Sequence, residues 1–169
     1  MRILLTSLIA CCLLAACAGT PPSPSSSGST FILVRHAEKD TSIPRDPPLT
    51  AEGVARAERL AVMLGDVALD AIYSSPYQRT LQTAAPTAHA HALPVREYDP
   101  GDATAFATRL RAEHPTGTVL VVGHSNTLPP LARALCGCTV ADMDEAIYGI
   151  RYTIDLNAQG RARLRESRD

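Results

Sequence analysis

Arg35 and His36 are adjacent residues whose side chains suit phosphate chemistry. A guanidinium offers a fork of hydrogen-bond donors to an oxyanion, and a neutral imidazole nitrogen can attack phosphorus. The pair directly follows the apolar run 31–34, which is typical of a short buried strand. Ligand sites of open α/β sheets lie at this end of a strand. An Arg-His pair by itself is usually part of the solvated surface, so this interpretation needs support from other parts of the chain.

The rest of the chain alternates between strand and helix patterns. Further strands are predicted at about 71–73, 93–98 and 118–122, and the tail 152–165 is typical of a hairpin on the sheet edge. Helices are predicted after Thr50 as N-cap, after Ser75 as cap with Pro76 as first residue, over 103–113, and over 128–135. This alternation predicts one α/β domain, a three-layer sandwich with a mostly parallel sheet and helices on both faces.

The first predicted helix is amphipathic. Apolar residues recur in it at helical spacing and are expected to face the sheet: Val54, Ala57, Leu60, Ala61 and Leu64. In the helix over 103–113, the pattern directs Phe106 and Leu110 inward.

Three strand ends carry residues of the same chemical kind. Arg35 and His36 follow the first strand, Arg79 lies one turn into the helix after the second, and His124 follows the strand 118–122. Because parallel strands end at the same sheet edge, the two histidines and two arginines are expected to meet there. A phosphoryl group in transfer spreads negative charge over its oxygens, so fixed cations supply most of what catalysis needs.

With these residues in place, the sequence resembles the histidine phosphatase superfamily, which includes the cofactor-dependent phosphoglycerate mutases. The resemblance runs from Phe31 to about Leu135 and implies a phosphoglycerate mutase-like fold. Four ordered motifs carry it: Val34-Arg35-His36-Ala37-Glu38, Leu49-Thr50-Ala51-Glu52-Gly53, Tyr73-Ser74-Ser75-Pro76 with Arg79-Thr80 and Gln82-Thr83-Ala84, and Gly123-His124-Ser125-Asn126. Ala37 stands where the family more usually has Gly, so an ordinary backbone conformation is expected there.

The resemblance also implies roles for individual residues. His36 would be the phosphate-accepting nucleophile, and the phosphoryl oxygens would be bound by Arg35, Arg79, His124 and Asn126. We expect the positive neighbours to keep His36 neutral near pH 7, a backbone carbonyl to accept from its other nitrogen, and His124 to be protonated. No cofactor is implied.

The proton donor is the part of the site where the resemblance is weakest. Larger members carry a Glu between the third strand and the following helix, where this chain offers Glu97, Asp99 and Asp102 without a clear motif. Asp99 is our prediction, because it lies just beyond the strand whereas Glu97 falls within it. Each of the three can equally be a solvated loop carboxylate, and some small members have no obvious donor. The chain lacks the insertions with which mutases cover their substrates, which favours a phosphatase.

The N-terminal residues 1–16 are typical of an export signal. Arg2 supplies a positive charge, and the apolar run 3–14 is too short for a permanent bilayer-spanning helix. Leu14-Ala15-Ala16-Cys17 resembles a bacterial lipobox, which predicts cleavage before Cys17 and its lipidation; a plain secretory signal is the alternative. Residues 17–30 are predicted to be the lipidated Cys and a Ser/Pro-rich tether, and 31–169 the phosphatase domain. The predicted location is the periplasmic face of a bacterial membrane.

Composition excludes other classes of function. The formal net charge is −1 and there is no basic run, which argues against nucleic-acid binding. Cys136 and Cys138 can form a strained disulfide, a weak metal site or an ordinary turn. His89 and His91 are predicted to lie in an Ala-rich polar loop. We predict no metal. Two functions therefore remain: a lipid-anchored phosphatase acting on a small phosphorylated substrate, and a non-catalytic lipoprotein that binds an anionic ligand or partner in the same pocket.

Overall fold

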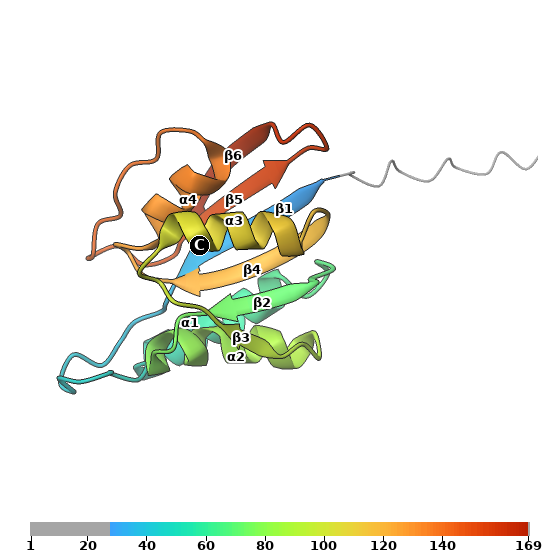
Figure 1. The fold of residues 1–169 in the computed structure, drawn as a ribbon. Coiled ribbons are helices and arrows are strands. Elements are labelled where there is room, and N and C mark those ends of the chain that lie inside the picture. The colour runs from blue at the N-terminus through green and yellow to red at the C-terminus, as the bar shows by residue number, and fades with distance from the viewer. Residues whose placement is uncertain (1–27, 169) are drawn as a thin grey trace, which may run out of the picture.

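The computed structural model describes residues 28–168, which form six strands and four helices (Figure 1). The strands are β1 (Ser29–Arg35), β2 (Ala71–Ser74), β3 (Val95–Glu97), β4 (Gly117–Gly123), β5 (Ile150–Leu156) and β6 (Ala162–Arg168). The helices are α1 (Ala51–Met63), α2 (Gln78–Ala90), α3 (Ala103–Glu113) and α4 (Leu128–Cys136). The predicted signal peptide and Cys17 lie outside the described residues. No helix within 28–168 is long and apolar enough to cross a bilayer.

One six-stranded sheet in the order β3-β2-β4-β1-β5-β6 forms the middle of the molecule. The first four strands of that order are parallel, and the hairpin β5-β6 joins β1 in antiparallel pairing. In this register Arg35 of β1 pairs with Gly123 of β4, and Ser74 of β2 pairs with Val122. Three strands therefore deliver the residues that follow them to the same edge, as the motifs predicted.

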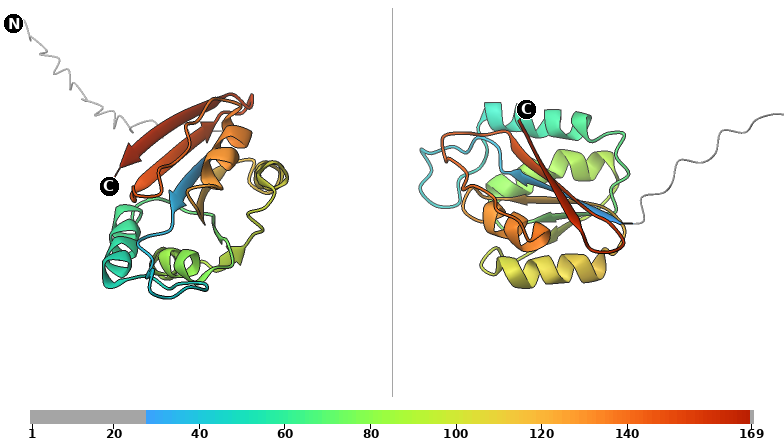
Figure 2. Two further views of the ribbon diagram at one scale, coloured as in Figure 1. Left: turned by 90° about the vertical axis from the view of Figure 1, so that its left-hand side faces the viewer. Right: turned by 90° about the horizontal axis from the view of Figure 1, so that it is seen from above.

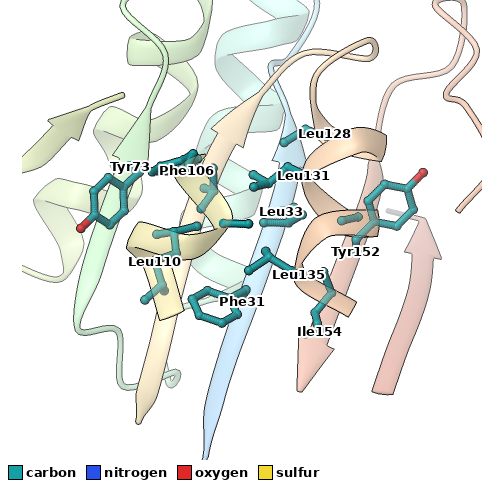
Figure 3. Packing of buried hydrophobic residues seen from close by; sticks show 14 of the residues in the cluster. Phe31, Leu33, Tyr73, Phe106, Leu110, Leu128, Leu131, Leu135, Tyr152 and Ile154 are labelled. Atoms are coloured by element: carbon teal, nitrogen blue, oxygen red, sulfur yellow. The ribbon is translucent and has the colours of Figure 1, made fainter. Parts of the chain in front are cut away.

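The two faces of the sheet are covered by different helix pairs, which confirms the three-layer sandwich. α1 and α2 pack on one face, and α3 and α4 on the other (Figure 2). Successive side chains of a strand point to opposite faces, so Phe31 and Leu33 of β1 lie in the α3/α4 core whereas Ile32 and Val34 lie in the α1/α2 core. Figure 3 shows Phe31 and Leu33 among the side chains of α3 and α4, including the predicted inward residue Leu110.

Several predicted boundaries are wrong by a few residues. β1 begins at Ser29, so the last two residues of the predicted tether 17–30 belong to the sheet, where Ser29 and Thr30 pair with β4 and β5. Thr30 also donates from Oγ1 to Asp155 Oδ1 at 2.9 Å. The third strand is shorter than the predicted 93–98, because the Leu93 amide donates to Ala88 O at the end of α2 and Tyr98 lies beyond the strand.

The start of α2 and one face of α1 also differ from prediction. Ser75 and Pro76 precede α2, whose N-cap position is Tyr77. At its other end α2 continues to Ala90, so His89 lies in the last turn of this helix and not in the predicted loop. The Ser75 hydroxyl does not cap because it is hydrogen-bonded to two side chains, described below. In α1 the predicted Thr50 cap is present, accepting from Gly53 N. Val54, however, is exposed, because Gly53 occupies the buried first turn against the backbone of Glu38.

Candidate active site

His36, Arg79 and His124 line one open cavity at the carboxyl edge of the parallel strands. The cavity measures about 360 Å³, and Asn126 also lines it. The two imidazole rings are 5.4 Å apart between centroids and inclined at 65°, and Arg79 Nη2 lies 3.4 Å from His124 Nδ1. The structure therefore brings together both predicted histidines, one predicted arginine and the predicted Asn126.

His36 is held in the orientation and tautomer that a nucleophile needs. Its amide donates to Gly123 O at 2.9 Å, which continues the β1–β4 pairing, and its Nδ1 lies 2.8 Å from Ala37 O. Because a carbonyl only accepts, Nδ1 carries the proton and Nε2 keeps its lone pair. The pKa of His36 is lowered to about 3, chiefly by burial and further by the charges of His124, Arg35 and Arg79, whereas the hydrogen bond with Ala37 O acts in the opposite direction. His36 is consequently neutral near pH 7, as expected.

Ala37 fits in place of the family's Gly without strain. Among residues 28–168 the non-glycine positions with positive φ are Asp46 and Ala92, so the Ala37 backbone is of an ordinary kind. Its amide donates to Thr83 Oγ1 of α2 at 3.0 Å, and Thr83 in turn donates to Arg79 O. The motif residue Thr83 thus joins the nucleophile's strand to the helix that carries Arg79.

His124 is held by a chain of hydroxyl groups. Its Nε2 lies 2.8 Å from Ser75 Oγ, which donates to Thr80 Oγ1 at 3.0 Å, and Thr80 donates to the carbonyls of Ser75 and Tyr77. Following the donors along this chain, Ser75 accepts from His124 Nε2–H, so Nδ1 is the nitrogen that faces Arg79. The sequence predicted a cap for Ser75 and did not detect this role.

The protonation predicted for His124 is wrong for the protein in this structure. Burial lowers its pKa to about 4, and the charges of Arg79, Lys39 and Arg35 act in the same direction, whereas Glu145 raises it. His124 is therefore neutral near pH 7. A bound phosphate dianion would favour the imidazolium, since an adjacent negative charge stabilises the charged form.

Arg35 is almost completely buried and supports a neighbouring loop. Its Nη1 donates to the carbonyls of Asp144, Glu145 and Ile147 at 3.3, 2.9 and 2.9 Å, and its guanidinium stacks 4.2 Å from the centre of the Tyr148 ring. Arg35 does not line the cavity of His36, although its buried Nε has no partner within residues 28–168. Its predicted contact with phosphate stays a prediction.

Arg79 lies between an acidic residue and an aromatic ring. Asp46 Oδ1 is 3.7 Å from Arg79 Nη1, and the guanidinium stacks 4.6 Å from the centre of the Tyr77 ring. The same Asp46 Oδ1 accepts from the Gln78 amide at 2.9 Å, which fixes the loop before α1 against the start of α2. The buried Nε of Arg79 has no partner in the described part of the chain, so this side chain retains donor capacity for an anion.

The predicted proton donor does not line this cavity. Asp99 is exposed, its Oδ1 accepts from Gly101 N at 2.8 Å, and it lines hollows on the α3 side instead. Glu97 is exposed in β3, and Asp102 caps α3 by accepting from Ala105 N. The carboxylate that does line the cavity is Glu145, whose Oε1 accepts from Ser125 Oγ at 2.9 Å. No motif pointed to Glu145, which lies in the loop before β5.

The two late cysteines form a disulfide, which is one of the alternatives left open by the sequence. Cys136 ends α4, and Gly137 between the two cysteines adopts φ 62°, a left-handed conformation that favours glycine at a helix end. The disulfide closes the turn after α4, away from the residues that line the cavity of His36.

Comparison with known proteins agrees with this site. The family model for the histidine phosphatase superfamily (branch 1) matches residues 31–100. The solved structure of the protein histidine phosphatase SixA complexed with tungstate is 20% identical, covers 82% of this chain and 96% of that chain, and has a TM-score of 0.71. A mycobacterial glucosyl-3-phosphoglycerate phosphatase is 16% identical, with coverages of 80% and 96% and a TM-score of 0.65. YhfR from Bacillus stearothermophilus is 23% identical, with coverages of 80% and 95% and a TM-score of 0.67. A search of curated proteins found no significant match.

The fold and the motif residues indicate the class of protein that this chain resembles. At these identities the structural likeness establishes the fold, and the family match covers the first three motifs. The chain is therefore similar to the histidine phosphatase superfamily over residues 31–100 and has the fold of the solved phosphatases named above.

Proposed function

We propose that this chain hydrolyses a phosphomonoester through a covalent phosphohistidine on His36. The lone pair of His36 Nε2 forms a bond to phosphorus while the bond from phosphorus to the ester oxygen breaks, and the departing oxygen takes a proton. Water then attacks the phosphohistidine, the P–N bond breaks, and inorganic phosphate leaves with His36 restored. Atoms and electrons balance without a cofactor.

The observation that carries this proposal is the hydrogen bond from His36 Nδ1 to Ala37 O. This hydrogen bond leaves Nε2 unprotonated. Burial and the nearby cations lower the pKa of His36, so the side chain is neutral at physiological pH. Arg79 Nη2 lies 3.4 Å from His124 Nδ1, and both residues line the cavity. Arg79, together with His124 once a bound phosphate dianion favours its protonation at Nδ1, can stabilise the charge on the phosphoryl oxygens. A pocket that only bound anions would not require a neutral, oriented imidazole among its cations.

Two carboxylates are candidates for delivering the proton to the leaving oxygen. Asp99 follows β3, where the family resemblance places a donor, but it lines neighbouring hollows. Glu145 lines the cavity itself and is oriented by Ser125, the residue after His124. Both remain candidates within the proposal, and the dependence of rate on the leaving group distinguishes them, as set out in the Discussion.

The phosphoenzyme is the decisive test of catalysis. The purified protein is mixed with a ³²P-labelled phosphomonoester, quenched in alkali and in acid, and analysed by peptide mapping. We expect label on His36 that survives alkali and is released by acid, together with turnover of p-nitrophenyl phosphate. Binding of phosphate without label or turnover would contradict the proposal and would support the alternative of a non-catalytic lipoprotein.

We also propose that the protein is exported and anchored to a bacterial membrane through an acylated Cys17. The support is the lipobox-like Leu14-Ala15-Ala16-Cys17 after a short apolar run, followed by a stretch rich in Ser and Pro before the domain. This location would give the enzyme access to small phosphorylated molecules of the cell envelope. The disulfide between Cys136 and Cys138 fits an oxidising compartment.

A further inference from the structure

A second hollow adjoins the cavity of His36. It measures about 490 Å³ and is formed largely by the loop 39–47 that leads into α1. Lys39, Tyr77 and Arg79 line both this hollow and the cavity of His36, so the two are contiguous. When the phosphate of a phosphoester is bound at His36, its leaving group can extend along these three side chains into the second hollow.

Lys39 is a cation without a partner among residues 28–168. It is the only lysine in the sequence, it is half-buried, and within residues 28–168 its ammonium makes no hydrogen bond or ion pair. The charge of Lys39 reaches the active site, because it contributes to lowering the pKa of His124. A half-buried ammonium that forgoes an internal partner is well placed to bind an external anion.

The second hollow as a whole is positively charged. Arg45, an exposed residue of the loop, also lacks an ion-pair partner in the described chain, and Arg79 contributes a third cation. The acidic side chain lining this hollow is Asp46, which is engaged by the Gln78 amide and lies 3.7 Å from Arg79. Three cations against one engaged carboxylate leave an excess of positive charge beside the catalytic cavity.

The loop that forms the hollow is anchored at both ends and in the middle. Lys39 pairs with Leu49 in an antiparallel bridge, and the Asp40 amide donates to Pro48 O at 2.8 Å. In the middle, Asp46 adopts a positive φ of 46° and accepts from Gln78 of α2. Prolines at 44, 47 and 48 restrict the backbone further. The backbone of Lys39 is therefore held beside the cavity of His36 by the fold and does not depend on a ligand.

We propose that this hollow is a subsite for a second anionic group of the substrate, bound by Lys39 with help from Arg45. The inference rests on the proposed phosphatase function and narrows its substrate class to phosphomonoesters whose leaving group carries a carboxylate or a second phosphate. An ammonium binds a carboxylate or a phosphate as a point charge. The subsite therefore selects substrates by the negative charge of the second group and by the distance of that group from the phosphoester.

The proposal is tested with matched substrates. ω-Carboxyalkyl phosphates of two to five carbons are compared with ω-hydroxyalkyl phosphates of the same length, and alkane-diol bisphosphates form a third series. At one chain length, we expect kcat/KM for the substrate with an anionic end group to exceed that for the hydroxyl substrate of the same length by about tenfold or more. One charge-assisted hydrogen bond at a half-buried site is enough for a gain of this size. Comparison of the carboxylate and bisphosphate series identifies which anion fits.

Variants assign the preference to Lys39. Lys39→Met should reduce the ratio of anionic to neutral kcat/KM to about threefold or less, and Lys39→Arg should keep most of it. Arg45→Gln should reduce the ratio by only about two- to fivefold, since the side chain is exposed. Arg59→Gln removes a cation of α1 that pairs with Glu52 and serves as the matched control, with no change in the ratio expected.

The outcomes separate this inference from the proposed function. A wild-type preference below twofold at every length, or a preference that Lys39→Met leaves intact, overturns the subsite. Equal slowing of both series by Lys39→Met would show that Lys39 binds the transferred phosphate, which also overturns it. If no ester is hydrolysed, the phosphatase proposal fails, and calorimetry with ω-carboxyalkyl and ω-hydroxyalkyl phosphonates still decides the subsite, because binding requires no turnover.

Discussion

Ser75 Oγ lies 2.8 Å from Nε2 of His124, across 49 residues of sequence. Both side chains are buried, and Ser75 passes the hydrogen bond on to Thr80 Oγ1. The bond fixes which imidazole nitrogen faces Arg79, so a serine that follows β2 orients a histidine that follows β4 toward the phosphate-binding cavity.

Removal of this hydroxyl tests the relationship. Ser75→Ala leaves His124 Nε2–H without its acceptor, so we expect kcat/KM to fall by about tenfold and the pH dependence of kcat to shift as His124 loses its fixed tautomer. Ser74→Ala is the control, because Ser74 is equally buried and donates only to the Ser75 carbonyl. If both variants lose the same activity with unchanged pH profiles, Ser75 acts through packing alone.

Substitution of the nucleophile His36 and substitution of its cationic neighbour Arg79 should have different kinetic effects. His36→Ala should abolish the phosphoenzyme and lower kcat by at least about 10⁴-fold, whereas Arg79→Ala should lower it by about 10² to 10³-fold and raise KM. Steady-state kinetics with p-nitrophenyl phosphate and ³²P labelling measure both effects, and circular dichroism checks the fold. Wild-type turnover by His36→Ala would disprove the mechanism.

The proton donor is identified by the leaving group. A poor alkoxide leaving group gains about 10² to 10⁴ in rate from a positioned acid, whereas nitrophenolate departs without one. The variant that removes the donor should therefore slow an alkyl phosphate far more than p-nitrophenyl phosphate. Asp99→Asn tests the residue predicted from sequence, and Glu145→Gln tests the carboxylate that lines the cavity. Glu97→Gln and Asp102→Asn are the controls; equal slowing of both substrates in a variant excludes that residue.

The two active-site histidines make stability depend on pH in a definite direction. Their pKa values are lowered to about 3 for His36 and about 4 for His124, chiefly by burial, whereas unfolded histidine titrates near 6.5. Between about pH 6.5 and 4 the unfolded chain binds more protons, so the free energy of unfolding falls as pH falls; above pH 6.5 this contribution is constant. Each histidine adds up to about 1.4 kcal/mol per pH unit.

Urea unfolding of the domain at pH 7, 6 and 5 measures this slope. The double variant His36→Gln, His124→Gln should show a clearly smaller loss of stability toward acid, because neither side chain binds a proton on unfolding. Inorganic phosphate, by favouring charged histidines in the folded state, should also reduce the slope in the wild type. An identical slope in the double variant would contradict the lowered pKa values.

Membrane attachment should depend on Cys17. In full-length protein expressed in a bacterium, Cys17→Ser removes the acylated residue, and the domain within 28–168 contains no helix that could span a bilayer. We expect the variant to leave the membrane fraction and to incorporate no labelled palmitate, with phosphatase activity unchanged. A Cys17→Ser protein that stays with membranes would contradict the lipoprotein proposal and favour a retained signal segment.

Local sequence patterns predicted most of the helices and strands and the sheet edge at which the site residues meet. The helix over 103–113, the Thr50 cap and the hairpin at the C-terminus were predicted as found, because hydrophobic period, capping and turn residues are local signals. The meeting of His36, Arg79 and His124 also followed from the sequence, since parallel strands with right-handed crossovers end at one edge.

The hydrogen bonds that hold these side chains, and the other residues of the cavity, depend on the packing of the folded chain and had no signal in the sequence. Ser75 was predicted to cap a helix, but its hydroxyl binds His124, and Glu145 enters the cavity from a loop whose position depends on carbonyls bound by Arg35. The carboxylate of Asp99, the predicted proton donor, accepts from the amide of Gly101 in its own loop. These choices arise from hydrogen bonds between residues far apart in the chain, for which local patterns carry no signal, and they are settled only when packing brings the partners within about 3 Å.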